Sequence, residues 1–264
     1  MKHFPINKAL AAAVSAAKAA GAVMRKNLTA KKKANEITSH DIKLELDVRC
    51  QKLIERKLHA AFPKISLLGE EGEAGDANAE YRWVVDPIDG TVNFAHGIPH
   101  ASVSIALQVQ SPRSKVQSHQ TIIGVVYDPF QDELWTAILG GPARMNGRVI
   151  HVSKNRELSE CIVSIGFAKS RAHMERALPY FLWLARRVRK IRMMGSAALA
   201  LTYVATGRLD VYIERGISLW DIAAGGLILE CAGGKFWREA TPGYHKFRMV
   251  ASNGLVHKKL RVPK

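Results

Sequence analysis

The spacing of the apolar residues changes along the chain, and this change constrains the fold more than any other feature of the sequence. Apolar residues recur at helical spacing over about 10–24 and again over about 41–61, where Pro63 ends the pattern. From residue 65 onward they alternate or form short runs, which is typical of strands. The sequence therefore predicts two long antiparallel helices and then the strands of one sheet, at 65–69, 82–86, 101–109, 121–128 and 132–139.

A second block, in which strands and helices alternate, begins near residue 150. Strands are expected at 161–167 and 208–214, and helices over 172–190, 195–207 and 220–234. Alternation of this kind favours an α/β arrangement, whereas helices followed by a run of strands favour α+β. We expect an α+β / α/β protein in which an N-terminal α+β half, 1–150, packs against a C-terminal α/β half, 151–264.

The charge balance is strongly basic. The formal net charge is +16, from 39 lysines and arginines against 23 aspartates and glutamates. Such a surplus indicates attraction to anions, which include phosphorylated metabolites, RNA and membrane surfaces. The basic residues gather at 31–33, 186–192 and 257–264. A solvated basic surface is favoured over a dedicated RNA face, because these runs lack interleaved aromatic residues and a nucleic-acid motif.

Cysteine spacing and hydropathy indicate the cellular compartment in which the protein is expected. Cys50, Cys161 and Cys231 are far apart and form no CxxC pair, which argues against a disulfide framework or a zinc site. The sequence has no apolar run long enough for a membrane span. Lys8 and Lys18 interrupt the alanine-rich N-terminal region, unlike a signal peptide. We expect a cytoplasmic protein without membrane contact.

The stretch WVVDPIDGTVNF, residues 83–94, ends an apolar strand on two carboxylates. Asp86 is expected to end the strand, Pro87 to turn the chain, and Asp89 to stand where a helix begins. Two like charges this close in a poorly solvated turn repel each other, so one must be protonated or a cation must hold both. Hard divalent cations such as Mg²⁺ take carboxylate oxygens as ligands.

Further carboxylates follow other predicted elements. Glu70 and Glu71 come directly after the strand at 65–69, and Asp221 lies in the first turn of the helix at 220–234. Each has a simple structural explanation when taken alone: a solvated loop for the glutamates, and a favourable helix dipole for Asp221. Their joint occurrence with the acidic turn instead indicates one metal site.

The acidic motifs together resemble those of the inositol monophosphatase family of Mg²⁺-dependent, lithium-sensitive phosphatases. The similar stretches are GEEG at 69–72, DPIDGTVNF at 86–94 and WDIAAG at 220–225, in the order and spacing of that family. The resemblance covers nearly the whole chain from about residue 40. It implies a layered αβαβα sandwich, a homodimer, and a phosphomonoesterase that acts by in-line attack of metal-activated water.

The resemblance also implies a ligand set for two to three Mg²⁺ ions, with Mn²⁺ as an alternative metal. Glu70, Asp86 and the backbone carbonyl of Ile88 would share one ion, and Asp86, Asp89 and Asp221 would hold a second. A third, weaker ion would lie near Glu70. The N-terminal half would thus carry most of the metal ligands, and the C-terminal half would contribute Asp221.

Two further sets of residues match family positions. Thr91 and Asp47, with Glu70, would orient and activate the attacking water; without the resemblance Asp47 reads as a surface acid in the middle of a helix. Free N–H groups at Gly90 and Thr91 would bind the substrate phosphate. The remaining substrate contacts would come from Asp89, Asp221, Gly195, Ser196, Ala197 and Glu214.

Several functions remain open at this point. Gly195, Ser196 and Ala197 equally suit a helix N-terminus, and Glu214 a strand-end surface acid. The leading hypothesis is hydrolysis of inositol 1-phosphate or a similar small polyol phosphate. A histidinol-phosphate or sugar-phosphate phosphatase is an alternative, with Glu214 contacting the amine of histidinol phosphate. A second alternative is an RNA or transcription-complex partner that uses the basic surface.

Overall fold

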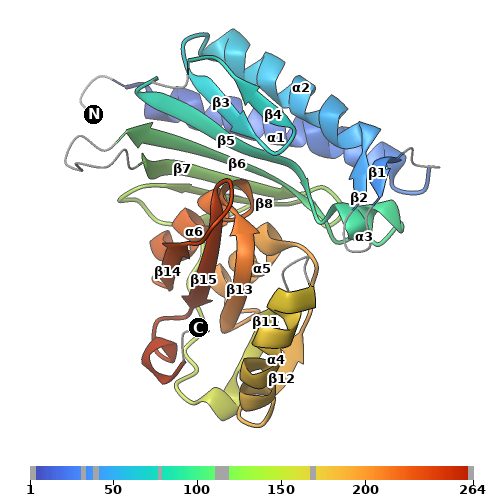
Figure 1. The fold of residues 1–264 in the computed structure, drawn as a ribbon. Coiled ribbons are helices and arrows are strands. Elements are labelled where there is room, and N and C mark those ends of the chain that lie inside the picture. Colours follow the sequence, from blue (N-terminus) through green and yellow to red (C-terminus); the bar gives the residue numbers. More distant parts are fainter. Residues whose placement is uncertain are drawn as a thin grey trace.

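Two β-sheets lie one above the other, and helices lie between them and on both outer faces (Figure 1). The computed structural model describes residues 4–30, 34–37, 42–76, 79–110, 119–166 and 171–260. Among these residues the first sheet has eight strands, the second has five, and a separate hairpin has two. The layers follow the order helix, sheet, helix, sheet, helix, which confirms the expected αβαβα sandwich. The lysine run at 31–33 and residues 261–264 lie outside the described residues.

The outer helical layer consists of α1 (Ile6–Asn27) and α2 (Glu45–Ala61), which run in opposite directions as predicted (Figure 1). The buried face of α1 consists largely of alanines at helical spacing, so the helix can lie close to the sheet. The second helix begins later than the expected residue 41. Residues 42–44 instead form β2 (Ile42–Leu44), which pairs antiparallel with β1 (Ala34–Ile37).

The first sheet has the strand order β10-β9-β8-β7-β6-β5-β3-β4. Only the β3–β5 pair is parallel among the described pairings of this sheet. Its strands are β3 (Ser66–Gly69), β4 (Gly72–Ala74), β5 (Tyr81–Asp89), β6 (Ser102–Gln110), β7 (His119–Asp128), β8 (Glu133–Ile138), β9 (Arg144–Met145) and β10 (Arg148–Val149).

The acidic turn departs from its predicted local structure. The strand β5 does not end at Asp86 but continues through Pro87 to Asp89, and α3 (Thr91–Ala95) follows. Pro87 has no N–H to donate, and the ladder with β6 is irregular between Asp86 and Asp89. Both carboxylates therefore lie at the end of a strand in the sheet rather than on a separate turn.

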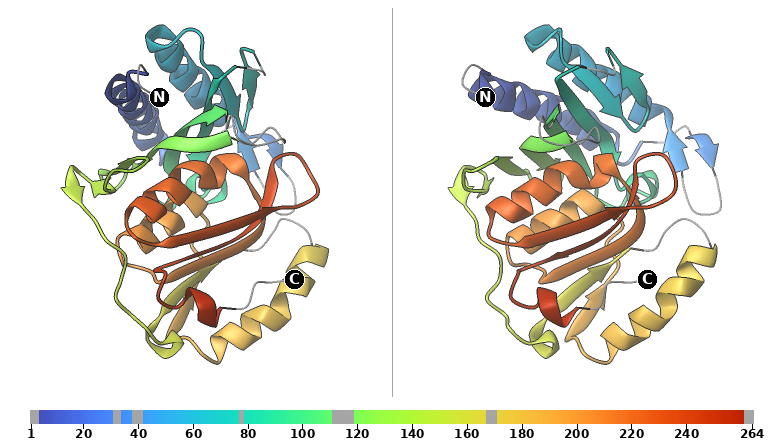
Figure 2. Two further views of the ribbon diagram at one scale, coloured as in Figure 1. Left: turned by 90° about the vertical axis from the view of Figure 1, so that its left-hand side faces the viewer. Right: turned by 60° about the vertical axis from the view of Figure 1, so that its left-hand side comes forward.

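The middle layer contains α5 (Ala197–Ala205) and α6 (Leu219–Cys231), which pack against each other between the two sheets (Figure 2). Almost every residue of α6 is buried, in agreement with its nearly uniform apolar sequence. Ser104 of β6 donates a hydrogen bond of 3.1 Å to the carbonyl of Trp220, which fixes the start of α6 against the first sheet.

The second sheet has the order β12-β11-β13-β15-β14, and α4 (Arg171–Ala185) covers its outer face (Figure 2). The helix expected over 172–190 ends at Ala185, because residues 190–192 pair in parallel with β11 as an edge strand. The strand expected at 208–214 lies at 211–218. The strands are β11 (Ile162–Ile165), β12 (Lys190–Arg192), β13 (Val211–Ser218), β14 (Lys235–Ala240) and β15 (Lys246–Ser252).

The two sheets use separate parts of the chain, 66–149 and 162–252, on either side of the expected boundary at residue 150. The core between them is nevertheless shared. Val84 and Val126 of the first sheet belong to the same buried cluster as Leu201 and Leu227 of the middle helices and Met249 of the second sheet. The division into halves stays a prediction, and the shared core favours one cooperative unit.

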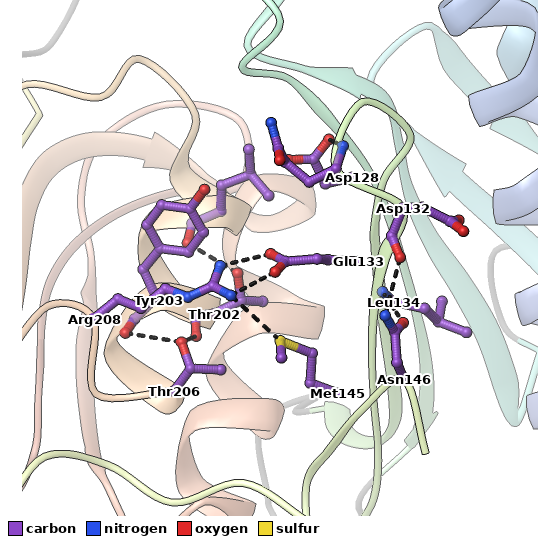
Figure 3. A network of polar contacts seen from close by, with 12 residues as sticks. Asp128, Asp132, Glu133, Leu134, Met145, Asn146, Thr202, Tyr203, Thr206 and Arg208 are labelled. Carbon is purple, nitrogen blue, oxygen red and sulfur yellow. Dashed lines mark hydrogen bonds and ion pairs between the residues drawn. The ribbon is translucent and has the colours of Figure 1, made fainter. Parts of the chain in front are cut away.

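A polar network joins the two parts of the chain at the end of α5 (Figure 3). Arg208 donates two hydrogen bonds of 2.5 Å to the carboxylate of Glu133 on β8, and its guanidinium lies 5.0 Å from the centre of the Tyr203 ring. Asn146 lies in the hairpin that follows β8, and its side-chain oxygen accepts a hydrogen bond of 2.9 Å from the backbone N–H of Leu134 on β8. These contacts hold the end of α5 against β8.

Replacing Gly124 by alanine is expected to lower the free energy of unfolding by about 1–3 kcal/mol, the usual cost of overpacking a core. A Cβ at this position of β7 would lie 2.6 Å from the carbonyl oxygen of Ala224 in α6, and backbone cannot move aside as a side chain can. Urea denaturation would measure the loss. Gly141→Ala is the matched control, because its nearest contact is 3.3 Å away; equal stability of the two variants would contradict the prediction.

Candidate metal centre

Three carboxylates from distant parts of the chain meet beside the start of α6. Within the described residues, Asp86, Asp89 and Asp221 each offer an oxygen, and these oxygens lie within 4.8 Å of one another. They line a cavity of about 410 Å³. The end of β5 supplies the two aspartates that are neighbours in sequence, and the first turn of α6 supplies the third.

Asp86 is buried among several other carboxylates. One oxygen of its side chain accepts a hydrogen bond of 3.0 Å from the backbone N–H of Ile88. Burial raises the pKa of Asp86 well above its usual value, and the nearby charges of Glu70, Asp89 and Asp221 raise it further. A cation at this position would remove the repulsion that these groups exert on one another.

Asp89 connects the acidic strand end to the start of α5. Its carboxylate accepts hydrogen bonds from the backbone N–H groups of Ala197 at 3.1 Å and Ala198 at 2.8 Å, and from the hydroxyl of Ser196. Burial raises the pKa of Asp89, and these hydrogen bonds oppose the shift. The first N–H groups of a helix lack partners within the helix, so Asp89 satisfies donors that α5 leaves open.

Two other acids occupy the first turns of their helices. Asp221 accepts the N–H of Ser218 at 2.8 Å at the start of α6, and Asp47 accepts the N–H of Leu44 at 2.7 Å at the start of α2. Asp47 is thus not the mid-helix surface acid that its sequence suggested; it lies in the first turn and is buried. Within the described structure, the N-termini of α2, α5 and α6 all approach carboxylates of this region, and their dipoles partly offset its negative charge.

The remaining residues of the predicted ligand set surround the three aspartates. Glu70 follows β3 and lines the same cavity. It does not belong to the group of Asp86, Asp89 and Asp221, whose oxygens lie within 4.8 Å of one another. The carbonyl of Ile88 accepts the hydroxyl of Thr91 at 2.8 Å, and that hydroxyl lies 3.4 Å from Asp47. Gly90 has a φ of 93°, and a Cβ there would lie 3.1 Å from the carbonyl oxygen of Gly195.

The predicted substrate contacts also line the cavity, but some of them have partners within the protein. Ser196 is the N-cap of α5, and its hydroxyl and the N–H of Ala197 both bind Asp89. Gly195 precedes them in the cavity wall. Glu214 lies on β13 and accepts the hydroxyl of Tyr212.

Sequence reasoning missed several residues of this cavity. Lys246, Ser218 and Tyr212 all line it, and Asn93 joins its rim by donating to the carbonyl oxygens of His100 and Met194, both at 2.9 Å. Asn93 lies within the DPIDGTVNF stretch but has no predicted role there, and none of the motifs quoted above contains Lys246, Ser218 or Tyr212. They reach the cavity through strand pairing and packing, which the sequence pattern does not record.

The donor set suits a hard divalent cation. It consists of carboxylate oxygens and a backbone carbonyl, and neither cysteine nor histidine lines the cavity among the described residues. Burial raises the pKa of Asp86, Asp89 and Asp221, and neighbouring carboxylates raise those of Asp86 and Asp221 further, so negative charge is poorly solvated here. A bound cation would supply the missing opposite charge.

Asp221→Asn is expected to stabilise the metal-free protein, and the gain is expected to grow as the pH rises from about 4 to about 7. Burial, with the charge of Asp89, raises the pKa of Asp221 from 3.8 to about 7. Below 3.8 both the folded and the unfolded wild type hold this proton; between the two values only the folded chain holds it. The wild type therefore loses stability from this group as the pH rises through that interval.

Thermal denaturation in a chelator at several pH values would measure this difference. Wild type and variant must be compared at each pH, because burial lowers the pKa of His119 and His245, which contribute to total stability with the opposite sign. A difference between the two proteins that stays constant from about pH 4 to about pH 7 would contradict the prediction.

Comparison with known proteins places this centre in a family. The model of the inositol monophosphatase family matches residues 6–262. An inositol monophosphatase of Mesembryanthemum crystallinum is 36% identical over 263 residues, which are 96% of this chain and 94% of that protein. A Nus factor SuhB of Xylella fastidiosa is 38% identical over 226 residues, or 84% of this chain and 78% of that protein.

A solved structure shares the whole architecture. The extragenic suppressor protein suhB from Bartonella henselae superposes with a TM-score of 0.85 at 34% identity, over 94% of this chain and 95% of that one. The acidic centre described above lies within the part of the sequence that the family model matches. The chain therefore belongs to the inositol monophosphatase family of phosphoric monoester hydrolases.

Proposed function

We propose that the protein is a Mg²⁺-dependent phosphomonoesterase that hydrolyses inositol 1-phosphate or a similar small polyol phosphate. The observation that supports this most directly is the meeting of the Asp86, Asp89 and Asp221 carboxylates in one cavity. The helix N-termini described above offset only part of the negative charge that these three buried or half-buried acids bring together. A divalent cation and a phosphate ester account for both the charge and the cavity.

The proposed ligands follow the family pattern residue by residue. Glu70, Asp86 and the carbonyl of Ile88 would hold one ion, and Asp86, Asp89 and Asp221 a second, with a third near Glu70; Mn²⁺ also suits these oxygen ligands. When bound, the ions would supply activation of the attacking water and stabilisation of charge on the leaving oxygen.

Thr91 and Asp47 are proposed to orient the attacking water. The Thr91 hydroxyl has one proton and two acceptors nearby, the carbonyl of Ile88 at 2.8 Å and Asp47 at 3.4 Å. When this proton turns toward Asp47, the hydroxyl oxygen is left to accept a proton from water. Burial raises the pKa of Asp47 to about 7, so its carboxylate can take up a proton near neutral pH.

The polar lining of the cavity supports a hydroxyl-rich substrate. Glu214 and Asp221 would accept hydroxyl protons of the substrate, and Gly90 and Thr91 would bind the phosphate on the family resemblance. Gly195, Ser196 and Ala197 would contact the substrate from the start of α5, although Ser196 and Ala197 already donate to Asp89. The amine of histidinol phosphate would also suit Glu214, and a sugar phosphate would suit the same cavity.

Phosphate release from a substrate panel tests the proposal. Inositol 1-phosphate, histidinol phosphate, glycerol 2-phosphate and fructose 1,6-bisphosphate would be compared with Mg²⁺, with Mn²⁺ and with a chelator. The expected result is metal-dependent hydrolysis with inositol 1-phosphate among the best substrates. Equal rates for all four esters would exclude the inositol assignment, and activity that persists in the chelator would exclude the metal.

Binding to RNA or to a transcription complex is a second candidate. Some relatives carry the name Nus factor SuhB, and this chain presents an exposed basic segment, residues 186–192, at the end of α4 and along the edge strand β12. A salt titration of RNA binding would test it, because affinity that rests on phosphate contacts falls steeply with salt concentration. Absence of binding near physiological salt would dismiss this candidate.

We also propose a cytoplasmic location and a homodimeric state. All three cysteines are free thiols, which suits a reducing cytoplasm, and among the described residues no helix is long and apolar enough to cross a bilayer. A homodimer is proposed from the family resemblance alone. Light scattering of the purified protein would measure its mass in solution.

A further inference from the structure

Lys246 introduces a positive charge into the wall of an otherwise acidic cavity. Of the described residues that line the cavity, Lys246 alone has a basic side chain, whereas the acids that line it are Glu70, Asp86, Asp89, Glu214 and Asp221. No pattern in the sequence connects Lys246 with this site, since it lies 25 positions beyond Asp221 and directly after a glycine- and proline-containing stretch.

Strand pairing explains how Lys246 reaches the cavity. It is the first residue of β15 and lies opposite Ser218, the last residue of β13. The register between these strands shifts between Arg215 and Ile217, where Gly216 has a φ of 79°. This irregularity adds one residue to β13, as in a β-bulge, and such insertions commonly redirect side chains beside functional sites.

The ammonium group is held in a defined position. Its Nζ donates a hydrogen bond of 2.6 Å to the hydroxyl of Ser218, whose own backbone N–H donates to Asp221 at 2.8 Å. The positive charge of Lys246 also lowers the pKa of Asp221, in agreement with its nearness to that carboxylate. The hydroxyl of Ser218 is the one hydrogen-bond partner of the Lys246 ammonium group in the described part of the chain, so two of its three N–H donors remain for a ligand.

Glu214 and Lys246 bring opposite charges to the lining of the same cavity. Glu214 lies four residues before Ser218 on β13, a separation of at most about 13 Å along an extended strand. The three aspartates mark the position proposed for the phosphate ester. The rest of a substrate in this cavity would then have both the Glu214 carboxylate and the Lys246 ammonium group among its possible contacts.

We propose that Lys246 makes the site prefer, between two polyol-type phosphate monoesters of equal size, the one whose carbon skeleton carries a carboxylate. This inference rests on the phosphatase function proposed above. A hydrogen bond from an ammonium group to an anion is stronger than one to a neutral hydroxyl, so the charge discriminates between two skeletons of equal size. The alternative is that Lys246 only holds the start of α6. It predicts that replacing Lys246 lowers kcat/KM by the same factor for every substrate.

A matched pair of substrates separates these two roles. Glycerol 3-phosphate and 3-phosphoglycerate differ in having a hydroxymethyl group or a carboxylate at the far end. The ratio of kcat/KM for 3-phosphoglycerate to that for glycerol 3-phosphate would be measured with Mg²⁺ in the wild type, Lys246→Met, Lys246→Arg and Lys235→Met. Lys235 is an exposed residue of β14 outside the cavity, so its variant controls for the loss of one positive charge.

Lys246→Met is expected to lower this ratio about tenfold, mainly through KM, because it removes one charge-assisted hydrogen bond. Lys246→Arg should restore most of the ratio, and Lys235→Met should leave it unchanged. An unchanged ratio in Lys246→Met, or an equal fall in Lys246→Met and Lys235→Met, would overturn the assignment.

The same design distinguishes failure of this inference from failure of the proposed function. If the wild type hydrolyses the panel esters but the ratio does not respond to Lys246, only the inference falls. If the wild type hydrolyses neither compound of the pair, the ratio of their dissociation constants is taken from calorimetry with the same four proteins, and the same tenfold change is expected. Absence of binding by both compounds counts against the inference as well.

Discussion

Asp86→Asn is expected to lower kcat by at least about 10²–10³-fold, the loss seen when one group that stabilises transition-state charge is removed. Asp86 is the residue proposed to contact both ions, so its asparagine cannot offset the charge of either. The fold should persist, because the amide oxygen of asparagine can still accept the N–H of Ile88. The variant also relieves repulsion from Glu70, Asp89 and Asp221, so the metal-free protein should unfold at a higher temperature than the wild type.

Two measurements on the same samples check this prediction. Phosphate release gives the change in kcat, and thermal denaturation with and without Mg²⁺ gives the stabilisation by metal, which should be large in the wild type and nearly absent in the variant. Asp89→Asn is a less specific test, because Asp89 also binds Ser196, Ala197 and Ala198 at the start of α5. Near-normal turnover by Asp86→Asn would remove the basis of the proposed metal centre.

Asp210→Ala is expected to lower the free energy of unfolding by about 3–5 kcal/mol, among the larger effects of a single substitution. The Asp210 carboxylate is buried and accepts the hydroxyl of Ser153 at 2.5 Å, the amide of Asn155 at 3.0 Å and the N–H of Ile162 at 2.7 Å. It therefore fixes the segment that connects the two sheets. Alanine leaves three half-buried donors without their acceptor, and each lost hydrogen bond costs about 1–1.5 kcal/mol.

Urea denaturation of the purified variant would measure this loss. Asp210→Asn retains one acceptor oxygen and should lose less stability than the alanine variant. Glu239→Ala is the surface control: it removes a half-exposed acid that pairs with Arg248, and a change of no more than about 1 kcal/mol is expected. Equal effects of Asp210→Ala and Glu239→Ala would show that the buried network does not hold the connecting segment.

Local patterns predicted the regular elements well and their ends poorly. The helical spacing at 10–24 and the apolar character of 220–234 correspond to α1 and α6. Helix α2 starts late because residues 42–44 pair with another strand, and α4 ends early because residues 190–192 pair with β11. In both cases a partner distant in sequence competes with the local helical preference.

For the acidic site, too, the sequence predicted the participants better than their contacts. Sequence motifs predicted which acids belong together, since Asp86, Asp89 and Asp221 lie in stretches that resemble one family. They did not show that Asp47 is a buried first-turn acid. Nor did they show that Asp89 holds the start of α5, where its contact with Ala197 joins residues 108 positions apart.

By itself, the sequence determined the order of helices and strands and the identity of the acids, because periodicity and motif chemistry depend on residues that are close along the chain. Only the tertiary structure decided that β5 runs through Pro87, that three helix N-termini approach the carboxylates, and that Lys246 joins them. Strand register and helix packing set these contacts. Both arise from the burial of apolar surface over the whole molecule, which no short stretch of sequence can specify.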